Sequence, residues 1–78
     1  MKHIKMLSLS KRDGKWLAKL ECTERYFPYI HVTNNIIASG LLSSDGSVFT
    51  GNCSVVSDKP IDVELVKNAI YQQWRVFG

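Results

Sequence analysis

Residues 58–77 read DKPIDVELVKNAIYQQWRVF and carry the clearest helix pattern in the sequence. A mostly apolar set of side chains recurs here every three to four residues, which places the set on one helix face. Its members are Leu65, Val66, Ala69, Ile70, Gln73, Trp74 and Phe77. Asp58 is suited to cap the first turn, where Pro60 also fits, so we predict a helix over residues 59–77. Its apolar face is wide enough to cover another layer.

The chain before this helix has the pattern of β-strands joined by turns. We predict strands at about residues 2–10, 15–24, 36–43 and 47–57. Asp13-Gly14 separates the first pair and Ser44-Asp45-Gly46 separates the second, and Asp-Gly between strand-like runs is a strong hairpin signal. The sequence therefore predicts two antiparallel hairpins.

The strands differ in how clearly they assign side chains to a face. Residues 16–23 alternate, and we expect the helix to cover the face of Trp16, Ala18, Leu20 and Cys22. In the first strand Ile4 and Met6 share one face while Leu7 and Leu9 share the other. Either this strand is buried on both sides, or a bulge shifts its phase near Met6. Phe49, Cys53 and Val55 are candidates for inward positions, and Gly40 and Gly51 suggest a bulge or a close backbone approach.

Residues 24–35 are harder to assign. The run 26–32 is aromatic and β-branched, but Pro28 cannot donate to a strand ladder, so a strand here is expected to be short or at an edge. Asn34-Asn35 is expected to break it. Together these signals predict a single α+β domain over residues 1–78: a two-layer sandwich in which a four- to five-stranded antiparallel sheet, with two Asp-Gly hairpins, is covered on one face by the C-terminal helix.

Composition limits the class of protein. The chain has 78 residues, 45% of them hydrophobic and 22% charged, which is typical of a globular domain. No apolar run approaches the ~20 residues of a membrane span, and the basic start lacks the apolar core of a signal peptide. We therefore expect a cytoplasmic protein that makes no use of a membrane. Cys22 and Cys53 are then expected to stay thiols.

The inventory of catalytic side chains is small. His3, His31 and the two cysteines show no spacing that places a thiol beside an imidazole, or that offers a set of metal ligands. There is no glycine-rich phosphate loop. We expect no enzymatic activity, no catalytic residues, no metal and no cofactor.

Positive charge is concentrated in the first third of the chain. Residues 1–25 hold seven Lys and Arg against three acids, whereas residues 26–57 contain one charged residue, Asp45. Lys11, Arg12 and Lys15 flank the first turn, and Lys2, Lys5 and Lys19 extend this cluster. Such a cluster either contacts nucleic-acid phosphates or is a solvated hairpin whose lysines protect a sheet edge.

Residues 26–31 are the candidate partner-binding segment. Tyr26, Phe27, Tyr29 and His31 offer aromatic rings, which are enriched at the centres of protein interfaces. The same rings, next to the basic cluster, also fit a stacking platform for single-stranded nucleic acid. The uncharged strands that follow are poorly defended against pairing with a partner or a second copy, so a homodimer fits the pattern as well.

One resemblance bears on the class of function. Met1-Lys2, Ile4-Lys5 and Leu7-Ser8 resemble the start of a family of small phage anti-CRISPR proteins that act on the type I-F surveillance complex. The resemblance covers the first eight residues. Where that family presents tyrosines on its sheet this chain has Met6 and Leu20, so no contact residue is carried over. It implies a phage-type protein of similar length and fold that blocks a host machine by binding it.

We therefore expect a non-enzymatic protein-binding module that inhibits a host protein or ribonucleoprotein assembly by steric occlusion. In this hypothesis the aromatic segment anchors the partner, and the hairpin at residues 11–15 steers the protein to an acidic or nucleic-acid-lined site. The alternative is a small nucleic-acid-binding module or regulator that uses the same basic hairpin.

Overall fold

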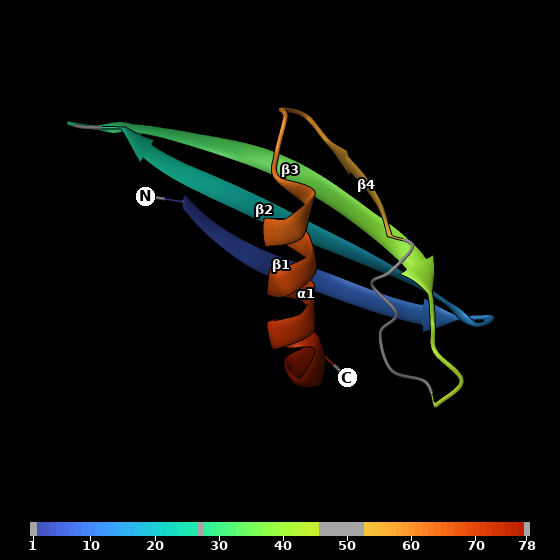
Figure 1. Ribbon diagram of the computed structural model, residues 1–78. Coiled ribbons are helices and arrows are strands. Elements are labelled where there is room, and N and C mark those ends of the chain that lie inside the picture. The colour runs from blue at the N-terminus through green and yellow to red at the C-terminus, as the bar shows by residue number, and fades with distance from the viewer. Residues whose placement is uncertain (1, 27, 46–52, 78) are drawn as a thin grey trace.

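The computed structural model describes residues 2–26, 28–45 and 53–77. In this part of the chain four strands precede one helix: β1 (Lys2–Arg12), β2 (Lys15–Tyr26), β3 (Ile30–Leu41), β4 (Ser54–Ser57) and α1 (Val63–Phe77). The strands form one antiparallel sheet in the order β1-β2-β3-β4. Figure 1 shows α1 crossing one face of this sheet, so the protein is α+β.

The first two strands show why the phase of β1 changes along its length. Arg12 pairs with Lys15 across a turn in which Asp13 and Gly14 both have positive φ, at 54° and 73°. The register shifts between Met6 and Ser8, so Leu7 is the extra residue of a bulge. Because of this bulge Ile4, Met6 and Leu9 all face the core, while Leu7 is 46% exposed. Of the two alternatives for this strand, the bulge is the correct one.

The core lies between α1 and the covered face of the sheet. Trp16, Ala18, Leu20 and Cys22 are buried as predicted, and Met6, Ile36 and Ala38 join them from the neighbouring strands. From the helix, the predicted face contributes Val66, Ile70 and Trp74. The rings of Trp16 and Trp74 meet edge to face, with centroids 6.0 Å apart. This arrangement is favourable for aromatic pairs, and it joins the sheet to the last turns of α1.

The prediction that Asn34-Asn35 ends a strand is wrong. Both residues lie inside β3, which begins at Ile30 rather than near residue 36. Asn34 faces the core and is buried, and its side-chain amide donates to the Lys59 carbonyl (3.0 Å) and accepts from the Lys59 N–H (2.9 Å). A tertiary contact therefore satisfies the polar group that made Asn34 look like a strand breaker.

The helix starts later than expected. It begins at Val63 because Asp62, and not Asp58, caps it: the Glu64 N–H donates to Asp62 Oδ1 at 3.0 Å. Asp58 instead accepts from the Asn35 side chain at 3.0 Å. Leu65 was predicted to lie on the buried face of the helix, but it is 42% exposed. The helix face that packs on the sheet is therefore narrower than predicted.

The second predicted hairpin falls partly beyond the described chain. β4 pairs with Ile36 to Ser39 of β3, and Cys53 and Val55 pack against the core from the inward side. The turn at Gly46, the inward position of Phe49 and the close approach of Gly51 lie outside the described residues. Gly40 does make a close approach, because Trp16 packs against it. In the described residues no helix has the length and apolar character needed to cross a membrane.

Candidate partner-binding surface

The sheet has a second face on which no described element packs. We call this the uncovered face and define it by the outward strand positions, of which the apolar ones are Leu17 of β2, Ile37 and Leu41 of β3 and Val56 of β4. Leu17 and Ile37 are each 46% exposed and Val56 is 68% exposed. Ile37 lies directly opposite Val56, and Leu17 is one strand away. These side chains form an apolar strip on a face that ordinarily carries polar residues.

The same face carries an excess of positive charge. Across the described strands, five cations occupy outward positions and Glu21 is the single acid among them. The five are Lys5, Arg12, Lys15, Lys19 and Arg25. Lys5 lies opposite Glu21, but Arg12 lies opposite Lys15, so two like charges face each other at the end of the β1–β2 ladder. Within the part of the chain that the structure describes, Arg12, Lys15 and Lys19 form no ion pair.

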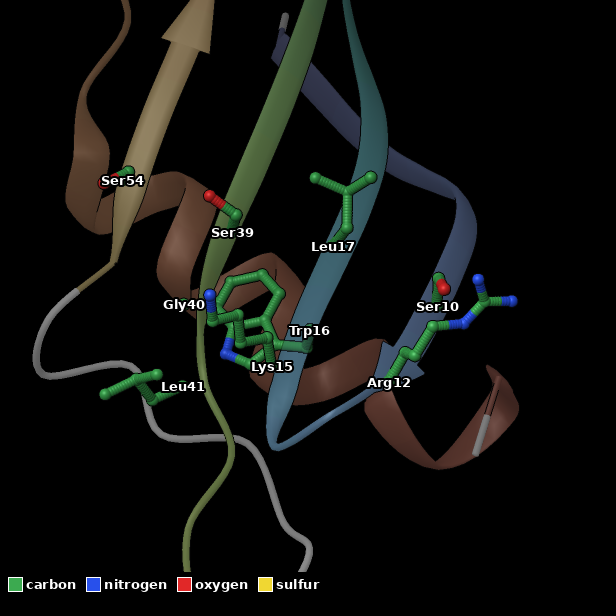
Figure 2. A pocket seen from close by; sticks show the side chains of 9 residues that line it. All are labelled: Ser10, Arg12, Lys15, Trp16, Leu17, Ser39, Gly40, Leu41 and Ser54. Atoms are coloured by element: carbon green, nitrogen blue, oxygen red, sulfur yellow. The ribbon is translucent and has the colours of Figure 1, made fainter.

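A hollow of about 330 Å³ opens at this end of the face (Figure 2). Arg12 and Lys15 line it together with three hydroxyls, those of Ser10, Ser39 and Ser54, and two apolar side chains, Leu17 and Leu41. Trp16 and Gly40 complete the lining. The helix lies behind the sheet in this view, so the hollow belongs to the uncovered face. Its volume is that of a small binding pocket, and its chemistry suits an anion with an aliphatic part.

The predicted basic cluster is divided between the two faces. Lys11 lies opposite Trp16 on the covered side, with its Nζ 4.6 Å from the centroid of the Trp74 ring. This cation–π contact makes Lys11 part of the packing between β1 and α1. Arg12 and Lys15 point to the uncovered face, as do Lys5 and Lys19. The side chain of Lys2 is outside the described set.

The predicted aromatic segment lies at the opposite end of the molecule. Tyr26 ends β2 and is 52% exposed, Tyr29 lies in the turn and is 87% exposed, and His31 is an exposed residue near the start of β3; Phe27 is not described. The Tyr26 hydroxyl donates to the Glu24 carboxylate, and this bond together with the nearby negative charge raises the pKa of Tyr26. β2 has 12 residues, and at ~3.3 Å per residue it separates this tip from the basic turn by roughly 36 Å. The structure thus does not bring the two predicted clusters together.

Neither cysteine has the setting of a nucleophile. Cys22 is buried in the core and Cys53 is half-buried, and both are free thiols. Burial raises the pKa of the Cys53 thiol, although the charge of Lys67 and a hydrogen bond with the Ser39 backbone act in the opposite direction. Activated cysteines have lowered pKa values. No group of three or more His, Cys, Asp or Glu residues suited to a metal ion occurs among residues 2–26, 28–45 and 53–77.

Comparisons with protein-family models, with curated proteins and with solved structures gave no match for this chain.

The apolar strip and the hydroxyls of the hollow were not singled out from the sequence. A signal for the strip was present, because the alternation of residues 16–23 places Leu17 opposite to the Trp16 face, where only polar side chains are expected. No local signal places Ser39 and Ser54 in the same hollow as Arg12, because this arrangement depends on the pairing of four strands.

Proposed function

We propose that the protein is a non-enzymatic binding module whose uncovered sheet face docks on an acidic surface of a protein partner. The partner we propose is a larger host protein or ribonucleoprotein assembly, which the module inhibits by steric occlusion in the manner of a phage anti-defence protein, such as an anti-CRISPR. The fold in this proposal is a two-layer sandwich, in which a sheet covered on one side has its other side free to bind. A second hairpin at Asp45-Gly46 is also part of the proposal.

The observation that carries the proposal is the combination of an apolar strip and an excess of positive charge on one uncovered face. Protein interfaces have an apolar centre, from which charged residues are depleted, and a polar rim. Leu17, Ile37 and Val56 supply such a centre. Arg12, Lys15 and Lys19 supply charge next to it, whereas Lys5 and Arg25 lie farther along the same face. The balance of five cations to one acid favours an acidic partner and would also speed its association.

The exposed aromatic tip is a second proposed contact. Tyr26, Tyr29 and His31 remain candidate anchors. Because they lie far from the hollow, we propose that they contact a different part of the same large partner. A partner that spans both regions must extend along most of the sheet, which is consistent with an assembly rather than a peptide.

Nucleic-acid binding is the alternative, and the excess of outward cations is the observation that favours it. A sheet that binds single strands, however, uses aromatic rings on its face to stack bases. The outward positions of the described strands carry no Phe, Tyr or Trp, and their aromatic rings, His3 and His31, lie toward the end of the sheet away from the basic turn. We therefore rank the protein partner first.

Affinity capture with the tagged protein tests the proposal. Captures from a bacterial lysate, with and without nuclease, are compared for the wild type, for Ile37→Asp on the uncovered face, and for Tyr71→Asp, which alters a side chain on α1 that is 69% exposed. We expect one protein assembly to persist after nuclease, to be lost with Ile37→Asp and to be retained with Tyr71→Asp. Material that disappears with nuclease would favour the nucleic-acid alternative, and equal capture by all three proteins would contradict the proposed surface.

A further inference from the structure

We propose that the hollow between Arg12, Lys15 and Leu41 is a carboxylate site, which receives an Asp or Glu side chain of the partner together with an adjoining aliphatic side chain. This inference rests on the proposed function, and it deepens that function by assigning the chemistry of one contact. All four strands of the sheet contribute lining residues to the hollow.

The charges of the hollow provide the first argument. Arg12 and Lys15 are directly opposite each other in the β1–β2 ladder. Like charges at such positions destabilise a strand pair. Elsewhere in this ladder Lys5 lies opposite the acid Glu21, whereas Lys19 lies opposite Ser8. Asp13 lies in the turn between Arg12 and Lys15, but no ion pair joins it to either of them in the described chain, so a bound anion would reduce an existing repulsion.

The shape and the hydrogen-bonding groups of the hollow provide the second argument. The hydroxyl of Ser10, on the same strand as Arg12, can donate to an anion, and the planar guanidinium of Arg12 can donate two parallel bonds to a carboxylate. Ser39 and Ser54 line the hollow from β3 and β4. Figure 2 shows these groups on the same side of the sheet as Leu17 and Leu41. The two leucines offer apolar contact to the carbon chain that carries the carboxylate.

The surroundings favour a protein carboxylate over a nucleic-acid phosphate. Leu17 connects the hollow with Ile37 and Val56, so the surface next to the anion site is apolar. A peptide segment can place aliphatic side chains there, whereas a phosphate backbone would leave this strip uncovered. The outward positions near the hollow also carry no aromatic ring for a base to stack on, since His3 and His31 lie toward the other end of the sheet.

Two blocked tripeptides test the site without the partner: acetyl-Leu-Glu-Leu-amide and its neutral analogue acetyl-Leu-Gln-Leu-amide. Amide spectra of the ¹⁵N-labelled protein are recorded during titration, and inorganic phosphate is titrated separately. The indole N–H of Trp16 is a useful reporter, because it is buried beside Gly40 with no hydrogen-bond partner in the described chain. We expect shifts at Ser39, Gly40, Leu41 and this indole, and an affinity about tenfold higher for the Glu peptide.

A matched pair of double variants supplies the control. Arg12→Gln/Lys15→Gln should abolish the preference for the Glu peptide, whereas Lys59→Gln/Arg75→Gln removes the same charge from exposed positions away from the sheet face and should preserve it. Equal affinity for the two peptides, or shifts away from the hollow, would overturn the carboxylate site. Stronger binding of phosphate than of the Glu peptide would overturn it in favour of a nucleic-acid backbone.

The captured assembly separates this inference from the proposed function. If Ile37→Asp abolishes capture while Arg12→Gln/Lys15→Gln leaves it unchanged, the uncovered face binds the partner and the carboxylate site is wrong. If neither variant changes capture, the proposed surface itself is wrong.

Discussion

Gly40 shows how one residue determines the packing of the largest core side chain. It lies opposite Trp16 on the covered face, and a Cβ added there would lie 2.9 Å from the Trp16 Nε1 and 3.0 Å from its Cζ2. Those atoms belong to a rigid, buried ring that also contacts Trp74, so the ring has little freedom to move. Glycine is needed at this position because the indole occupies the space of a side chain.

Gly40→Ala should therefore destabilise the protein by about 1–3 kcal/mol, as overpacking of a filled core does. Urea unfolding measures the change, and the double variant Gly40→Ala/Trp16→Phe should lose less than the sum of the single variants, because the smaller ring relieves the clash. An unchanged or higher stability for Gly40→Ala would contradict the packing, since alanine is otherwise favoured over glycine in a strand.

The adjacent residues Asn34 and Asn35 allow a matched comparison. Asn34 is buried and bonded to both backbone groups of Lys59, whereas Asn35 is exposed and bonds Asp58. Asn34→Ala should cost about 1–3 kcal/mol of unfolding free energy, because two backbone groups lose their partners. Asn35→Ala should stay within about 0.5 kcal/mol of the wild type. Equal effects in urea unfolding would show that the Asn34 bonds do not anchor the segment before α1.

Cys53 predicts a dependence of stability on alkaline pH. Burial raises the pKa of this thiol above its ordinary value of 9.0, so the folded state keeps the proton at a pH where the unfolded state has lost it. Stability from this group is fully present below pH 9.0 and is lost as the pH rises through the folded-state pKa. The unfolding free energy should thus fall less between pH 8 and pH 10 in Cys53→Ala than in the wild type. A parallel fall in both proteins would contradict this assignment.

At the scale of elements, Gln73 connects the helix to the edge strand of the sheet. The Met6 N–H donates to Gln73 Oε1 at 2.9 Å, and Gln73 Nε2 donates to the Ile4 carbonyl at 3.2 Å. Both backbone groups belong to β1, an edge strand, and lie just before the bulge at Leu7. An exposed edge tends to pair with other chains, so the helix both packs on β1 and occupies part of its edge.

Gln73→Met, which keeps the length of the side chain, should remove this protection. We expect amide exchange at Met6 to accelerate and the unfolding free energy to fall by about 1–2 kcal/mol. Gln72→Met changes an exposed neighbour on the same helix and should do neither. If Met6 exchanges at the wild-type rate in Gln73→Met, the side-chain bonds are not what protects this amide.

The elements could be predicted where local pattern and tertiary packing agree. The alternation of Trp16, Ala18, Leu20 and Cys22 identified the buried face of β2 correctly, and the phase change of β1 pointed to its bulge. The start of β3 was missed because Asn34 is polar and buried, and the partner that satisfies it is 25 residues away. The start of α1 was missed because Asp58 and Asp62 are both suitable caps, and the bond from Asn35 engages the first of them.

At the scale of the whole molecule, function depends on which side chains the sheet gathers on each face. The protein is elongated, with extents of 47 × 22 × 17 Å, and α1 occupies one side of it. Lys11, Arg12 and Lys15 were predicted to act as one cluster. In the structure Lys11 lies over the Trp74 ring, whereas Arg12 and Lys15 lie on the uncovered face. Sequence alone located the charge correctly in the first hairpin but did not divide it by face, although adjacent strand residues such as Lys11 and Arg12 point to opposite faces.

Lysine footprinting of the captured assembly after nuclease treatment tests most directly whether the uncovered face is the one that binds. The lysines are distributed over both sides: Lys5, Lys15 and Lys19 lie on the uncovered face, and Lys59 and Lys67 lie before and on α1. Acetylation of the free and the bound protein is compared residue by residue by mass spectrometry. The proposed surface predicts protection of Lys5, Lys15 and Lys19 in the complex, with Lys59 and Lys67 unchanged. Protection of Lys59 and Lys67, with the sheet lysines still reactive, would place the partner on the helix and contradict the account.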